Sequence, residues 1–302
     1  MEKVSLTPGG LEVSPLVAGV MKWGVWGADL DRNAMQSLVS EAAELGFTTI
    51  DHADIYGNYT TEAAFGAAIA DLGSAFRGQL QLISKCGIRM VTKNRPNNRL
   101  KAYLTSKEYI IQSVETSLNN LGTDYLDLLL IHRPDLLMEP HEVAEAANEL
   151  KTAGKILHFG VSNFTPSQFN LLNKHTTLVT NQVECSPLHP EPMLDGTFDQ
   201  LALQHARPMV WSPFGGGKYF NEENSAARRL RQTVLEIDEK YNSPGEDVIL
   251  LSWLLRHPAG IVPILGTSKI ERLRSATNAL NVNLDSQDWY AILEAARGRE
   301  VA

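Results

Sequence analysis

The stretch YLDLLLIH (residues 125–132) is apolar over most of its length and ends in a histidine. Such near-continuous apolarity is typical of a strand that is buried on both faces of a parallel sheet. Seven similar runs lie along the chain, and longer segments separate them. They are LVAGV (16–20), FTTID (47–51), LQLISK (80–85), ILHFGVSN (156–163), LVTNQVE (178–184), PMVWS (208–212) and IVPILG (261–266).

Helical patterns occupy the segments between these runs. Residues 33–45 place Met35, Leu38, Val39, Ala42 and Leu45 on one stripe at three- and four-residue spacing. Further helices are expected after a Ser106 cap up to the Gly122 stop, and over residues 140–150, 166–172 and 270–280. Eight apolar runs separated by helices predict a (β/α)8 TIM barrel, with an open doubly wound sheet as the alternative because local patterns do not show closure.

Other segments complete the predicted architecture. VSLTPGGLEVSP (residues 4–15) predicts a β-hairpin that plugs the N-terminal end of the barrel. No linker-like shift in composition interrupts residues 1–302, so we expect a single barrel domain. Two long connections without an obvious element, residues 87–105 and 213–224, are expected at the C-terminal face, where barrel enzymes place their active sites.

Composition excludes several classes of protein. The net charge of −8 argues against nucleic-acid binding. The longest apolar run, residues 248–255, falls well short of the ~20 residues that span a bilayer, and the first residues show no secretory pattern. Cys86 and Cys185 suit a reducing compartment, so we expect a cytoplasmic protein. The histidines lack metal-ligand spacing, and no metal site is expected.

Ionisable residues gather at the predicted strand ends. Asp51, Lys85 and His132 close the second, third and fourth strands, and Tyr56 follows in a loop. Each residue alone has an ordinary structural interpretation, but four on adjacent strand ends favour a shared site. A lysine close to a tyrosine lowers the pKa of the phenol, and an aspartate keeps the buried ammonium charged. With His132 positioning the reacting oxygen, the set predicts a proton donor to a carbonyl that accepts hydride.

Several motifs resemble the signatures of the aldo-keto reductase family, in the family's order and over nearly the whole chain. They are DHADIYG (51–57), ISKCG (83–87), LLLIHRPD (128–135), HFGVSNF (158–164), NQVE (181–184), WSPFGGG (211–217) and PILGTSK (263–269). The resemblance implies a (β/α)8 barrel, a nicotinamide cofactor that is usually NADPH, and reversible reduction of aldehydes or ketones. It also implies that Asp51, Tyr56, Lys85 and His132 form the catalytic tetrad, with Tyr56 as the general acid.

The resemblance further implies which residues contact the cofactor. Ser162, Asn163 and Gln182 match the positions that bind the nicotinamide carboxamide, although Asn163 is also a candidate helix cap before Pro166. Trp211 matches the aromatic ring on which the nicotinamide stacks. Because glycine has no side chain, the backbone N–H groups of the glycine-rich segment could approach the pyrophosphate. The residues implied along the pyrophosphate are Ser212, Phe214, Gly215, Gly216 and Gly217, and Met21 and Asp51 complete this part of the site.

A last segment matches the part of the family that meets the adenosine 2′-phosphate. It comprises Thr267, Ser268, Lys269 and Arg272 at a helix N-terminus, where orphan N–H groups and a guanidinium favour phosphate. NADPH is therefore expected over NADH. The chain departs from the family at Gly266, where many members carry lysine, and at Ser275-Ala276 near the adenine. It also has Arg133 where many members carry tryptophan.

The connection 87–105 and the residues beside it are rich in positive charge and free of acidic residues. The basic residues are Arg89, Lys93, Arg95, Arg99, Lys101 and Lys107. The two hypotheses are that they steer an anionic cofactor or substrate, or that they only keep a mobile loop solvated.

Two other functions stay open. A Schiff-base lyase or aldolase would use Lys85 as its nucleophile. Barrels of this family also serve as non-catalytic subunits of potassium channels, which we rank last because no long segment precedes the first strand. Because the chain ends soon after its last helix, we expect a small carbonyl substrate rather than a bulky one.

Overall fold

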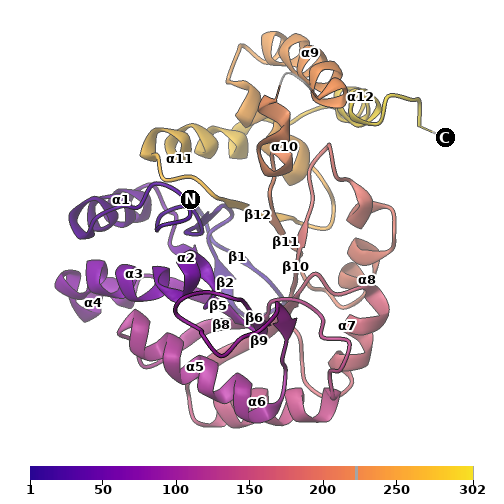
Figure 1. Ribbon diagram of the computed structural model, residues 1–302. Helices are drawn as coiled ribbons and strands as arrows, with labels where there is room; N and C mark the ends of the chain where they lie inside the picture. Colours follow the sequence, from indigo (N-terminus) through magenta and orange to yellow (C-terminus); the bar gives the residue numbers. More distant parts are fainter. Residues whose placement is uncertain (222–223, 302) are drawn as a thin grey trace.

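A closed barrel of eight parallel strands forms the centre of the computed structural model, which describes residues 1–221 and 224–301 (Figure 1). Each predicted apolar run supplies one strand. In chain order they are β3 (Val17–Gly19), β4 (Thr49–Asp51), β5 (Gln81–Cys86), β8 (Leu126–Ile131), β9 (Ile156–Ser162), β10 (Asn181–Glu184), β11 (Met209–Trp211) and β12 (Val262–Leu265). β12 pairs back to β3, which closes the barrel and excludes the open sheet.

Helices surround the strands (Figure 1). The predicted ones are present as α1 (Arg32–Glu44), α5 (Lys107–Leu121), α6 (Pro140–Thr152), α7 (Pro166–Asn173) and α11 (Ile270–Thr277). Ser106 caps α5 by accepting from the N–H of Tyr109, and Gly122 ends it with a left-handed backbone (φ 63°). The segment expected to be helical up to residue 280 leaves the α-helix after Thr277 and continues as the 3₁₀ turn η4 (Asn278–Asn281).

Further helices were not anticipated in the sequence. They are α2 (Tyr56–Tyr59), α3 (Thr61–Ile69), α4 (Gly73–Arg77), α8 (Thr197–Leu203), α9 (Ser225–Lys240), α10 (Glu246–Leu255) and α12 (Ser286–Arg297), with 3₁₀ turns η1 (Ala70–Leu72) and η2 (Glu191–Met193). The apolar run at residues 248–255 belongs to α10, where residues 248–254 are all buried. A helix buried all round has no polar stripe, so its sequence lacks the amphipathic period.

The predicted hairpin is confirmed and lies against the N-terminal end of the barrel. β1 (Val4–Ser5) pairs antiparallel with β2 (Glu12–Val13). Leu6, Leu11 and Val13 are buried in one cluster with inward-facing residues of the barrel. The carbonyl of Leu6 also accepts a hydrogen bond from the N–H of Arg207, just before β11. The hairpin therefore closes this end of the barrel, and its apolar residues complete the interior core.

Both long connections contain more structure than expected. Residues 87–105 include β6 (Ile88–Arg89) and β7 (Ala102–Tyr103), which pair as a small antiparallel ribbon. The connection after β11 contains the 3₁₀ segment η3 (Gly215–Phe220), whereas its residues 222 and 223 lie outside the described part of the chain. The expectation of connections without elements was wrong, because two-residue strands and glycine-rich turns leave no periodic signal.

Cys86 and Cys185 are both free and buried. Cys86 packs in the cluster between strands and helices, as strand alternation next to an inward-facing Lys85 predicts. Across residues 1–221 and 224–301, none of the helices is both long and apolar enough to cross a membrane.

Candidate active site

Strand alternation carries two of the predicted residues into the barrel. Ile83 faces the interior, so Lys85, two residues further along β5, faces the same way at the C-terminal end. Leu128 and Leu130 face the interior from β8, and His132 follows as the next residue in that row. The apolar lower layers thus fix the direction of the polar residues above them.

The Lys85 ammonium is the centre of a buried polar cluster. Its Nζ lies 2.6 Å from Asp51 Oδ2, 2.7 Å from the carbonyl oxygen of His52 and 3.2 Å from the Tyr56 hydroxyl. Lys85 and Asp51 are 1% and 3% exposed, so the ion pair is shielded from water. The three polar partners account for the three protons of the ammonium, which satisfies a charge that would otherwise be costly to bury.

Lys85 retains its charge in this environment. Burial lowers the pKa of the ammonium, but the attraction of Asp51 and Tyr56 and the hydrogen bonds to both outweigh burial, and the pKa is raised overall. A protonated amine has no lone pair with which to attack a carbonyl. This environment therefore weighs against the Schiff-base alternative.

The pKa of Tyr56 moves in the direction opposite to the expected one. Burial of the phenol raises the pKa, and the charge and hydrogen bond of Lys85, which lower it, do not compensate. The expectation of a net lowering was wrong because the lysine cannot approach the phenol without both groups being withdrawn from water. Tyr56 therefore stays protonated at neutral pH, next to a cation whose charge favours the phenolate.

His132 faces Tyr56 from the other side, with the two ring centroids 6.1 Å apart and the rings nearly perpendicular. Burial, together with the charges of Lys85, Arg133 and Lys101, places the pKa of His132 well below its usual range. Its Nδ1 is buried and has no hydrogen-bond partner among the described residues. The ring is therefore neutral at pH 7, and a proton on Nε2 avoids leaving a buried N–H donor without an acceptor.

The residues predicted for the nicotinamide form one hydrogen-bond network. Asn163 Nδ2 donates to the His132 carbonyl oxygen and to Ser162 Oγ, and Asn163 Oδ1 accepts from the indole N–H of Trp211. Ser162 Oγ donates to the carbonyl oxygen of Gln182. Asn163 has a left-handed backbone (φ 63°), which is rare outside glycine, and Thr165 rather than Asn163 caps α7.

The glycine-rich segment after β11 only partly matches the expected cradle. Ser212 and the three glycines all have positive φ, and a Cβ on Gly217 would meet nothing within 4 Å. However, the N–H groups of Gly215 and Gly217 already donate to the carbonyls of Ser212 and Phe214. The turns that bring the glycines together therefore use two of these three N–H groups.

The segment predicted for the 2′-phosphate runs from the end of β12 into the first turn of α11. Lys269 and Arg272 are exposed there, and neither forms an ion pair within the described part of the chain. Thr267 accepts from the N–H of Lys269 through Oγ1 and from the indole of Trp23 through its carbonyl. Met21 is 38% exposed immediately after β3. The Lys269 and Arg272 side chains fit an anionic ligand in charge and accessibility.

The sequence did not single out Trp26, whose ring centroid lies 6.2 Å from that of Tyr56. Its position could have indicated it, because Trp26 follows the first predicted strand and so lies at the end of the barrel where the site forms. The basic connection also meets this region. Arg95 packs over the ring of Tyr59, with its guanidinium carbon 4.2 Å from the centroid, while Lys107 pairs with Glu145 and Glu149 instead.

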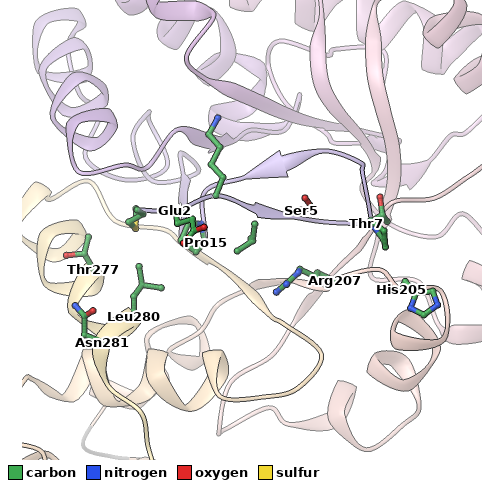
Figure 2. Close-up of a pocket in the computed structure, with 13 residues that line it drawn as sticks. Glu2, Ser5, Thr7, Pro15, His205, Arg207, Thr277, Leu280 and Asn281 are labelled. Carbon is green, nitrogen blue, oxygen red and sulfur yellow. The ribbon is translucent and has the colours of Figure 1, made fainter.

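One hollow of the described surface lies away from this cluster. Its volume is about 990 Å³, and Figure 2 shows its lining residues around the hairpin, among them Glu2, Ser5, Arg207 and Asn281. It contains none of the predicted site residues. Within the described residues, no three His, Cys, Asp or Glu side chains come together in a way that would hold a metal ion. The polar cluster at the C-terminal ends of the strands is therefore the candidate site.

Comparison with protein families identifies the group to which this site belongs. The model of the aldo/keto reductase family matches residues 15–297, which include every residue of the polar cluster. The chain belongs to the aldo/keto reductase family. This aldo/keto reductase is accordingly an enzyme, and its class is that of the oxidoreductases.

Several known proteins resemble this aldo/keto reductase over their whole length. Oxidoreductase YdhF of Escherichia coli is 44% identical over 100% of this chain and 99% of its own. The uncharacterized oxidoreductase YcsN of Bacillus subtilis is 42% identical over 100% of both chains. A 6-dehydroglucose reductase of Agrobacterium fabrum is 39% identical, again over 100% of both.

Solved structures agree with the fold. A thermostable aldo-keto reductase in complex with the inhibitor epalrestat superposes with a TM-score of 0.80 and 26% identity, covering 98% of this chain and 100% of that one. The holo form of an aldo-keto reductase from Bacillus halodurans gives a TM-score of 0.83 at 24% identity, over 100% and 98% of the two chains. At that identity the likeness supports the barrel fold alone.

Proposed function

We propose that this aldo/keto reductase reduces small aldehydes or ketones to alcohols with NADPH, and that Tyr56 is the proton donor. The observation that carries the proposal is the buried Lys85 ammonium, which contacts the Tyr56 hydroxyl and Asp51 at once. This arrangement supports proton transfer to an oxygen that gains negative charge. The oxidoreductase names of the relatives favour a reductase over a non-catalytic channel subunit.

Each residue of the cluster has a separate task in this proposal. Tyr56 is protonated at neutral pH and donates its proton to the carbonyl oxygen of the substrate. Lys85 stabilises the phenolate that remains, and Asp51 keeps the ammonium charged and oriented. His132 donates a hydrogen bond from Nε2 to the same carbonyl oxygen, which fixes the oxygen near the phenol. In the oxidation of an alcohol, the phenolate accepts the proton instead.

The cofactor would lie against residues that fit it in chemistry. A bound nicotinamide cofactor supplies the reducing electrons of the reaction. Trp211 and the Ser162–Asn163 pair would orient its ring, and Gln182 would bind its carboxamide. Exposed Lys269 and Arg272 favour a 2′-phosphate, and hence NADPH over NADH.

Two relatives suggest the size of the substrate. Proteins 39% and 32% identical to this chain are named 6-dehydroglucose reductase and methylglyoxal reductase. We therefore propose a small, polar carbonyl compound as the substrate. We also propose that the whole chain is a single barrel domain. The two free, buried cysteines are compatible with the reducing cytoplasm.

The test is a titration of NADPH and NADH against tryptophan fluorescence, followed by oxidation of each cofactor with a panel of carbonyl compounds. We expect NADPH to bind more tightly than NADH and small aldehydes to be reduced. Trapping of a substrate on Lys85 by borohydride, without any cofactor oxidation, would overturn the proposal in favour of imine chemistry.

A further inference from the structure

Arg133 lies beside the candidate site, and the described residues provide no counter-charge for it. It is the residue after His132, beyond the end of β8, and its guanidinium carbon lies 5.5 Å from the ring centroid of Trp211 at the end of β11. The side chain is half-buried. Within residues 1–221 and 224–301, no carboxylate lies within ion-pair distance of this guanidinium.

Two of the other cations withdrawn from water in this protein are paired with carboxylates. Arg77 lies 3.1 Å from Asp127, and Lys85 lies 2.6 Å from Asp51. Removing a charge from water is costly unless an opposite charge or hydrogen bonds replace the solvent. For Arg133 the described residues supply an aromatic face, which is a weak substitute for a charge. A ligand that carries its own negative charge would complete the site.

The surroundings add to the positive field. The charges of Arg133 and of Lys101, from the basic connection, both disfavour a proton on His132. Arg133 therefore adjoins the ring that is proposed to hold the substrate oxygen, and the exposed Lys101 adds positive charge from another segment. An anionic substrate gains mainly from Arg133, since its half-buried position limits screening by water and salt, whereas the charge of the exposed Lys101 is screened more strongly.

We propose that Arg133 binds the substrate, and that this enzyme selects carbonyl compounds with an anionic group, a carboxylate or a phosphate. The proposal rests on the proposed function, because it concerns the same site. The segments expected to hold the cofactor phosphates follow β11 and β12, whereas Arg133 follows β8. The planar guanidinium can donate two parallel hydrogen bonds to either anion, which makes Arg133 a specificity-determining residue.

The test compares matched substrates. Succinic semialdehyde and butanal differ by a carboxylate, and glyceraldehyde 3-phosphate and glyceraldehyde differ by a phosphate. In the wild type we expect kcat/KM to be about ten- to a hundredfold higher for the anionic member of at least one pair. Arg133→Met should reduce that ratio by the same factor, and Arg133→Lys should retain part of it. Arg32→Met, which removes an exposed arginine at the start of α1 that pairs with Asp71, should leave the ratio unchanged.

Three kinetic results would overturn the inference. The first is equal kcat/KM for both members of each pair in the wild type. The second is an equal loss on all substrates in Arg133→Met together with weaker NADPH binding, which would assign Arg133 to the cofactor. A better rate with glyceraldehyde than with either anionic compound would indicate recognition of neutral hydroxyl groups and would also contradict it.

A binding measurement separates this inference from the proposed function. Because Arg133 packs on Trp211, an anion that pairs with it should change the tryptophan fluorescence. We expect 4-hydroxybutyrate to give a saturable change in the wild type that weakens about tenfold or more in Arg133→Met, while 1-butanol gives none. If no carbonyl compound is reduced but this change persists, the proposed reaction fails and the anion site stands. If the change is absent, the anion site fails.

Discussion

The side-chain amide of Gln182 donates a 2.8 Å hydrogen bond to Asp51 Oδ1, which joins β10 to β4 on the opposite side of the barrel. Lys85 occupies the other carboxylate oxygen, Oδ2. Both oxygens of Asp51 thus accept a hydrogen bond, one from the Lys85 ammonium and one from Gln182, which is predicted to bind the cofactor. This bond connects the two halves of the candidate site.

Replacing Gln182 with methionine tests that connection. The variant keeps the length of the side chain but removes the donor to Asp51 Oδ1, and we expect kcat/KM to fall about tenfold or more. In the double variant with Asp51→Asn, the loss in kcat/KM should be smaller than the product of the two single losses, since both changes break the same hydrogen bond. Gln200→Met, a buried amide on α8 that donates to Asn170, is the matched control. Fully multiplicative losses would show that the bond has no role in turnover.

Tyr56→Phe removes the proposed proton donor and little else. We expect turnover to fall by about a hundred- to ten-thousandfold while the Kd for NADPH stays within about twofold, because the phenol acts on the substrate oxygen. Tyr290→Phe removes a hydroxyl from an exposed position on α12 and should have wild-type activity. A Tyr56→Phe enzyme with full activity would refute the assignment of Tyr56 as the acid.

The preference for NADPH depends on charges at the start of α11. Arg272→Met should raise the Kd for NADPH about tenfold and leave the Kd for NADH nearly unchanged, because only NADPH carries the 2′-phosphate. Arg274→Met, from the last turn of the same helix, controls for the loss of one positive charge. The measurement is a fluorescence titration with each cofactor. A parallel loss for both cofactors would contradict the prediction.

His52 makes the stability of the fold sensitive to acid. Burial, with the charge of Lys85, lowers the pKa of His52 to about 3, and neither ring nitrogen has a partner among the described residues. The unfolded chain, with a histidine pKa of about 6.5, then binds a proton that the folded protein does not. At pH values under about 6.5, this residue should therefore lower the free energy of unfolding by about 1.4 kcal/mol for each unit that the pH falls.

His52→Phe should remove that contribution. The ring packs edge-on against Phe65, with centroids 4.4 Å apart, so phenylalanine fits the same position without a titrating group. Urea unfolding of both proteins at pH 7 and pH 5 measures the difference. We expect the variant to lose less stability than the wild type over this range. Identical losses of stability in the two proteins would mean that the pKa of His52 does not differ between the folded and the unfolded state.

Much of the candidate site could be predicted from local sequence. The apolar runs fixed the strands, and the period of two along each strand fixed which residues face inward, so Lys85 and His132 followed from Ile83 and Leu130. The hairpin could be predicted in the same way, because its turn glycines and flanking apolar residues are adjacent in the chain. Helix α10 could not, since burial on all sides removes the periodic pattern.

The sequence by itself determined the eight strands, several of the helices between them and the polar groups at the strand ends, because each depends on residues close together in the chain. Closure of the barrel depended on the pairing of β12 with β3, which lie far apart in the chain. Only the tertiary structure decided how those groups act on one another. The bond from Gln182 to Asp51, the contact of Arg133 with Trp211 and the raised pKa of Tyr56 each depend on segments far apart in sequence. Desolvation and charge depend on everything packed around a group, and that is set only when the barrel closes.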